Sequence, residues 1–213
     1  MSFISNLSWR YATKNFDPSK PVSADNIRAI QDAIRLAPTS FGLQPFHVTV
    51  VTNPELKAVL QGHAYGQTQI TSCSHLFVFS ARTDVLPRID AVIDLVSGGD
   101  EAKKTESKGY GDMMRGSLSS KSPEEILGWA SRQAYIALGF ALAASAELEV
   151  DSCPMEGFDN AAFKADLGLA DHLHPVVILP VGYRAETEVP RPKVRFGIDD
   201  LLTNGDSVSV LKS

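Results

Sequence analysis

The segment 122–147 constrains the fold of this 213-residue chain more than any other. Ser122 can cap a helix, Pro123 suits the first helical position, and Glu125 completes a capping box. Residues 134–146 are then almost entirely apolar and rich in alanine. A helix that is apolar all round is buried on every side, and small side chains let its neighbours approach closely. We expect either the central helix of a large core or a helix packed against a second subunit.

Helical and extended patterns are mixed along the rest of the chain. A helix begins near Ser23, a good N-cap, presents one apolar face and ends at Pro38. Strands are predicted over 46–52, 75–81 and 175–183, and shorter helices over 54–62, 88–96 and 160–167. Too few strands alternate with helices for a doubly wound sheet, so the fold class is α+β.

Two segments lack a clear pattern of their own. Residues 97–121 are polar and rich in glycine, serine and lysine, which predicts a mobile loop or lid. The tail 184–213 is rich in proline at first, with Pro190 and Pro192, and is then predicted to be extended. Tails without a core of their own usually dock on another surface.

Composition excludes several classes of protein. The net charge of -5 and the scattered basic residues argue against nucleic acid as a partner. No apolar stretch reaches the roughly 20 residues that span a bilayer, and no signal peptide is visible at the N-terminus. Cys73 and Cys153 are too few for a disulfide framework, so we expect two buried, reduced thiols and a cytoplasmic protein.

Several familiar catalytic motifs are missing from the sequence. It contains no P-loop, no G-x-S-x-G and no H-E-x-x-H, and the glycines of 109–111 match a dinucleotide-binding loop only weakly. His172 and His174 lack further ligands at metal-binding spacing, so no metal site is predicted. Asp90 and Asp94 are four residues apart, which is more typical of a solvated helix face than of a catalytic pair.

Two basic pairs lie near the two ends of the chain. Arg10 and Lys14 would be read as a solvated helix face if they stood alone. Lys193 and Arg195 form a second pair, on one side of an extended segment. If the two pairs converge, they can bind one phosphate, with arginine giving a bidentate fork and lysine a point charge.

Two turns carry groups suited to a polar heterocycle. Thr39 and Ser40 supply hydroxyls directly after Pro38, and Gly157 would let the backbone approach a flat ligand closely. Each turn, taken alone, is better explained by ordinary turn chemistry.

These same segments resemble the motifs of the FMN-dependent nitroreductase family. Residues 10–16 resemble R-x-S-x-K-x-F, and residues 38–46 resemble P-S-S-x-N-x-Q-P-W. Residues 154–158 match P-x-E-G-F, and residues 192–195 match P-K-x-R. The four motifs occur in order over nearly the whole chain. The resemblance implies one domain over 1–213, a central, mostly antiparallel sheet surrounded by helices, and an intertwined homodimer that the tail 184–213 embraces.

The resemblance also implies roles for individual residues in FMN binding. Arg10, Lys193 and Arg195 would contact the phosphate, and Lys14 the N1/O2 edge of the isoalloxazine ring. The backbone of Glu156 and Gly157 would face N5. The remaining positions implied at the cofactor are Tyr11, Ala12, Gln69, Pro154, Met155 and, from the partner subunit, Pro38, Thr39 and Ser40. Phe41 and Phe46 would shape the substrate site.

Three positions depart from the family motifs. Ala12 replaces a serine, so any contact there is through the backbone. Gly42 replaces an asparagine, and Gln69 stands where a lysine is common. Loss of positive charge near the reduced, anionic ring should lower the flavin potential.

The sequence thus predicts an oxidoreductase that passes electrons from NAD(P)H through FMN to a nitroaromatic, a quinone or a similar small acceptor. Both substrates would use one flavin face in turn, which gives ping-pong kinetics. The flavin carries the hydride chemistry, so no side-chain nucleophile is needed, and Lys14 would stabilise negative charge on the ring. The alternatives are a flavin- or ligand-binding module without turnover and a dimeric scaffold without a cofactor.

Overall fold

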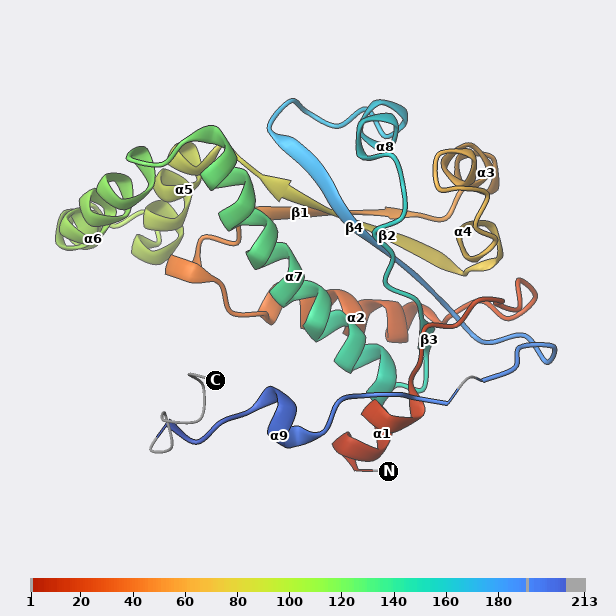
Figure 1. Ribbon diagram of the computed structural model, residues 1–213. Helices are drawn as coiled ribbons and strands as arrows, with labels where there is room; N and C mark the ends of the chain where they lie inside the picture. Colours follow the sequence, from red (N-terminus) through yellow and green to blue (C-terminus); the bar gives the residue numbers. More distant parts are fainter. Residues whose placement is uncertain (1, 191, 206–213) are drawn as a thin grey trace.

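The computed structural model describes residues 2–190 and 192–205. Four strands form one antiparallel sheet in the order β1-β2-β4-β3, as expected for an α+β fold (Figure 1). These strands are β1 (Phe46–Val51), β2 (His75–Arg82), β3 (Asp151–Ser152) and β4 (Leu173–Gly182). β2 is central, and its side chains from Leu76 to Ala81 are buried on both faces.

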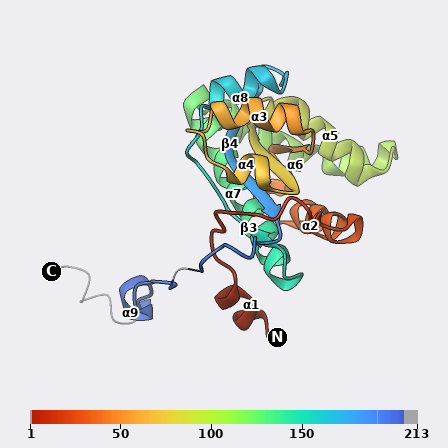
Figure 2. The same cartoon turned by 90° about the vertical axis from the view of Figure 1, so that its right-hand side faces the viewer.

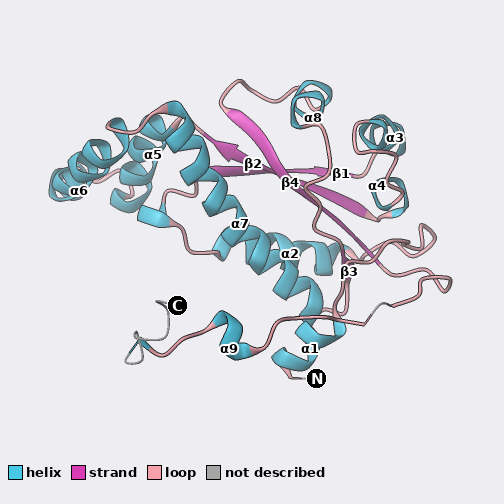
Figure 3. Cartoon of the chain, in the orientation of Figure 1, coloured by secondary structure: helices cyan, strands magenta, loops and turns pink. Residues whose placement is uncertain are grey.

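Helices cover both faces of the sheet (Figure 3). One face packs on α2 (Ala24–Leu36) and α7 (Pro123–Glu147), with Phe77 and Phe79 in the centre of that core. The other face packs on α3 (Pro54–Gly62), α4 (Gln69–Ser72) and α8 (Asn160–Asp166), around Leu76, Val78 and Ile178. Successive side chains along each strand point to opposite faces of the sheet and therefore pack in two separate cores.

Helix α7 begins as its sequence predicts. Ser122 Oγ accepts from the backbone N–H of Glu125, and the Glu125 carboxylate accepts from the backbone N–H of Ser122, which is a complete capping box. A single chain does not bury this helix on every side, so of the two expected settings only packing against a second subunit stays a prediction. Tyr135, Ile136 and Phe140 are exposed on one face, although the opposite face is part of the core.

The expectation of a loop over 97–121 is wrong, because most of this segment is helix α6 (Glu101–Ser119). Asp100 caps the helix, and the buried positions Gly111, Met114 and Leu118 follow helical spacing. They face α5 (Val85–Ser97), whose Asp90 pairs with Arg115. α6 is therefore attached to α5 by one narrow row of buried residues and by ion pairs, although the rest of its surface is polar.

The two ends of the described chain lie on the same side of the fold (Figures 1 and 2). α1 (Phe3–Trp9), which the sequence did not predict, packs near the end of α7. The described residues after β4 include the helix α9 (Ile198–Leu201), which lies apart from the sheet in both views. The tail predicted over 184–213 includes Arg191 and 206–213, which lie outside the described residues.

Candidate anion and cofactor site

A pocket of about 340 Å³ lies between the segment after α1, the segment after β3 and the tail. It is lined by Arg10, Tyr11, Ala12, Lys14, Pro154, Glu188, Pro192, Lys193 and Arg195. The two basic pairs that the sequence singled out, at opposite ends of the chain, therefore converge in one place.

The N-terminal segment is fixed against the edge of the sheet. Ala12 forms a parallel bridge with Ser152, and Phe16 an antiparallel bridge with Arg184. Thr13 Oγ1 donates to Asp151 Oδ1 at 3.1 Å, and Arg184 Nε donates to the same carboxylate at 2.8 Å. Asp151 is only 3% exposed, so this buried carboxylate holds the N-terminal segment and the start of the tail together.

Two aromatic rings enclose the guanidinium of Arg184. Its central carbon lies 4.4 Å from the centroid of the Trp9 ring and 4.7 Å from that of Tyr11. Both distances suit a cation–π interaction. Because Trp9 and Tyr11 flank Arg10 in the sequence, these two contacts fix the backbone that places Arg10 and Tyr11 in the pocket.

The tail reaches the same segment through Lys193. Its Nζ donates to the backbone carbonyl oxygens of Leu7 and Arg10, each at 2.5 Å. Burial, followed by the charge of Arg195, lowers the pKa of Arg10. Burial, followed by the charges of Arg10 and Arg195, likewise lowers the pKa of Lys193. Three cations therefore lie close enough to repel one another.

These cations have no carboxylate counter-ions in the described part of the chain. None of the ion pairs found there includes Arg10, Lys14, Lys193 or Arg195. The one acid lining the pocket, Glu188, accepts from the backbone N–H groups of Lys14 and Asn15, each at 3.0 Å. An excess of positive charge in a pocket suits an anionic ligand.

One donor beside the pocket also lacks a partner. Arg10 Nε is buried and makes no hydrogen bond to any described residue. Buried donors are normally satisfied, and an anion with several oxygens would accept from the guanidinium of Arg10. The residues present therefore fit the phosphate of a cofactor such as FMN.

Lys14 contacts the end of β3 rather than an acid. Its Nζ lies 3.7 Å from Cys153 Sγ, and burial raises the pKa of this thiol despite the nearby positive charge of Lys14. Gln69 is buried beside Cys153, where its side chain stabilises the thiolate form. Cys73 and Cys153 are both buried and unbridged, as the sequence predicts.

The predicted residues at 154–157 form a turn that leads away from the pocket. Only Pro154 is part of the pocket lining. Met155 is buried and pairs with Ile178, whereas Glu156 and Gly157 are exposed. Tyr135 and Gln67, which the sequence did not single out, hydrogen-bond to this turn. No local pattern marks them or Glu188, because each acts on residues distant in the sequence.

The predicted residues after α2 lie outside this pocket in the same chain. Pro38 and Thr39 lead into the short helix η1 (Ser40–Gly42), and the Ser40 N–H donates to Gln133 Oε1 at 2.8 Å. Phe41 packs against the core at the beginning of α5 and the end of α6, and Phe46 lines a separate pocket of about 310 Å³. Their expected roles at the cofactor and substrate stay predictions.

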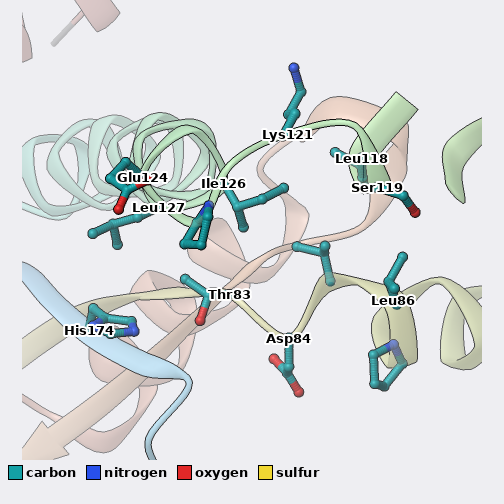
Figure 4. Close-up of a pocket in the computed structure, with 13 residues that line it drawn as sticks. Thr83, Asp84, Leu86, Leu118, Ser119, Lys121, Glu124, Ile126, Leu127 and His174 are labelled. Carbon is teal, nitrogen blue, oxygen red and sulfur yellow. The ribbon is translucent and has the colours of Figure 1, made fainter. Parts of the chain in front are cut away.

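A larger pocket of about 570 Å³ lies between the beginnings of α5 and α7 and the end of α6 (Figure 4). Its walls are mostly apolar, and Ile126 and Leu127 face Thr83 across it (Figure 4). Of the two acids on its border, Asp84 is paired with Arg82 at 2.6 Å, and the charge of Glu124 is opposed by Lys121 on the same border. This pocket therefore has no excess of positive charge, and the smaller pocket is the better candidate for an anionic cofactor.

Known proteins similar to this chain include members of one family. A family profile described as "Nitroreductase family" matches residues 7–183. A protein from Staphylococcus saprophyticus named "Putative NAD(P)H nitroreductase" is 34% identical over 94% of this chain and 95% of its own length. A Bacillus subtilis protein of the same name is 32% identical over 92% of this chain and 93% of its own length.

Solved structures with lower identity share the fold. A Bacillus subtilis protein that is 21% identical has a TM-score of 0.87, with 95% of this chain and 98% of that chain covered. A protein from Exiguobacterium sibiricum, solved in complex with FMN, is 17% identical and has a TM-score of 0.82, with 95% and 97% covered. No helix in the described part of the chain is long and apolar enough to cross a membrane. On the family match and the sequence identity to its relatives, this chain belongs to the nitroreductase family, whose members are oxidoreductases.

Proposed function

We propose that this protein is an FMN-dependent oxidoreductase that passes electrons from NAD(P)H to nitroaromatic, quinone or similar acceptors. The observation that carries the proposal is the convergence of Arg10, Lys193 and Arg195 on one pocket without counter-ions. A phosphate dianion there would gain charge-assisted hydrogen bonds from groups that otherwise repel each other. The FMN complex of the Exiguobacterium protein and the names of the Staphylococcus and Bacillus relatives support the same cofactor and electron donor.

The residues around the pocket have separable roles in this proposal. Arg10, Lys193 and Arg195 hold the phosphate. Lys14 Nζ contacts Cys153 Sγ rather than a carboxylate, so its charge has no counter-ion among the described residues and is available to the N1/O2 edge of the ring. When bound, FMN supplies hydride acceptance and donation. The chain itself binds the flavin, orients it and provides positive charge beside it.

In this proposal, the part of the site that binds the electron acceptor is completed by a second copy of the chain. Pro38, Thr39 and Ser40 lie away from the pocket of their own chain, so they would reach the flavin of the partner subunit. Exposed apolar residues on α7 and on the tail, including Phe140 and Phe196, support a homodimer that the tail embraces. Phe41 and Phe46 would then border the acceptor. One flavin face serving both substrates in turn gives ping-pong kinetics.

Anaerobic reduction of the purified holoprotein tests this function. A yellow protein that NADH or NADPH bleaches, and that a quinone or nitroaromatic recolours, is the expected result. Initial-rate plots at several acceptor concentrations should be parallel. A yellow protein that neither donor bleaches would instead be a flavin-binding module without turnover. A colourless protein whose apo form does not bind FMN would contradict the cofactor assignment.

A further inference from the structure

The turn at Glu156 and Gly157 is tied to the rest of the fold by two side chains from distant parts of the chain. Tyr135 Oη, from the middle of α7, donates to Glu156 Oε1 at 2.5 Å. Gln67 Nε2, from the segment between α3 and α4, donates to the Gly157 carbonyl at 2.9 Å and to the Ala64 carbonyl at 3.1 Å. Each side of the turn thus has its own anchor.

The backbone of this turn leaves two adjacent donors free. Met155 N–H donates to Ile178 O at 2.9 Å, and Phe158 N–H donates to Glu156 O at 2.9 Å. Between them, the N–H groups of Glu156 and Gly157 have no partner among the described residues. Both residues are exposed, so these donors are available to a ligand.

The anchors restrict where these donors point. α7 has 25 residues and a complete capping box, so Tyr135 is attached to a rigid element. Burial, followed by the Glu156 carboxylate, raises the pKa of Tyr135, so its hydroxyl keeps the donated proton at neutral pH. Gln67 also packs closely on Gly157, because a Cβ at this position would lie 3.3 Å from Gln67 Nε2.

We propose that Tyr135 and Gln67 are positioning residues that hold the Glu156 and Gly157 N–H groups toward N5 of the flavin. The inference rests on the proposed function, because the acceptor of these donors is the cofactor. Neither side chain needs to touch the flavin. Each acts by limiting the freedom of a turn that follows directly on Pro154, which lines the phosphate pocket. Loosening the turn should weaken an interaction at N5 and leave the phosphate contacts intact.

The test compares FMN with 5-deazaFMN, which carries C–H in place of N5 and cannot accept a hydrogen bond there. The full-length apoprotein is titrated with both flavins. Tyr135→Phe and Gln67→Met should each weaken FMN by about two- to tenfold, the range of a single neutral hydrogen bond, and leave 5-deazaFMN unchanged. Tyr183→Phe is the matched control, since its hydroxyl contacts Asn26 Nδ2 at 3.5 Å, away from the turn. It should change neither affinity.

Hydrogen exchange of the apoprotein gives a readout that needs no flavin. The amides of Met155 and Phe158, which flank the turn, should exchange faster in Tyr135→Phe than in the wild type. Unchanged exchange would overturn the anchoring role, as would equal losses of affinity for both flavins or no loss for FMN. Wild-type apoprotein that binds neither flavin would instead overturn the proposed function and, with it, the N5 assignment, whatever the exchange rates.

Discussion

Lys193 donates a hydrogen bond to the backbone carbonyl of Arg10 across a separation of 183 residues in the sequence. This contact joins the tail to the N-terminal segment and brings the side chain of Arg195 beside that of Arg10. The electrostatic character of the pocket thus depends on tertiary structure at both ends of the chain. Substitutions far from the pocket should therefore reduce anion binding if they detach the N-terminal segment or the tail from the rest of the fold.

Removal of the buried carboxylate of Asp151 should destabilise the protein. Asp151→Ala leaves the guanidinium of Arg184 and the hydroxyl of Thr13 without their partner. Breaking a fully buried ion pair costs about 3–5 kcal/mol, and the 26% exposure of the Arg184 side chain lowers our expectation to about 2–3 kcal/mol. Urea unfolding measures the change. Asp32→Ala, which breaks only surface pairs with Arg28 and Arg35, should have a much smaller effect. Equal effects would contradict the structural role of Asp151.

Stability should decrease as the pH falls from 7.5 to 5.5. Burial, followed by the charge of Lys57, lowers the pKa of His75, and burial, followed by the charges of Lys164 and His172, lowers that of His174. The unfolded chain therefore binds protons at these positions before the folded chain does, so the free energy of unfolding falls as pH decreases through this range. Urea unfolding at both pH values measures the slope. A His75→Gln/His174→Gln variant, compared with its own value at pH 7.5, should have a smaller slope, and an unchanged slope would contradict the assignment.

A charge on the exposed face of α7 should prevent dimer formation. Phe140 lies on this face with Ile136, and burial of a carboxylate in an apolar interface is strongly unfavourable. Sedimentation of Phe140→Glu should show a monomer at concentrations where the wild type is a dimer. Val59→Glu changes an exposed apolar residue on α3 and should remain dimeric. A wild-type protein that is monomeric, folded and loaded with flavin would contradict the proposed assembly.

Most of the regular structure could be predicted from local sequence. The strand signals at β1, β2 and β4 and the capping box of α7 depend on neighbouring residues, and all are confirmed. α6 could not be predicted, because its helical stripe of Gly111, Met114 and Leu118 is defined only by packing against α5. α1 was missed for a similar reason, since its place depends on contact with α7.

The candidate site likewise contains residues that could be predicted from the sequence and residues that could not. Its charged residues could be named from the sequence because four motifs carry them, and the structure brings the two basic pairs together. The groups that hold these residues could not be named. Asp151, Glu188 and Tyr135 each act on a segment at least 21 positions away, and such separations leave no trace in a local pattern. The expected cofactor roles of Pro38, Thr39 and Ser40 depend on the proposed second subunit, so no feature of the single chain bears on them.

Titration of apoprotein with FMN and riboflavin tests the phosphate assignment most directly. Arg195 lines the pocket and makes no ion pair to a described residue, so its charge is available to a ligand. Loss of one charge-assisted hydrogen bond costs about 1.5–3 kcal/mol, or roughly one to two decades in affinity. Arg195→Ala should therefore weaken FMN by that amount and leave riboflavin, which lacks the phosphate, nearly unchanged. Lys14→Ala, the comparison variant, should weaken both flavins because its proposed partner is the ring. Equal losses for FMN and riboflavin in Arg195→Ala would contradict the phosphate site.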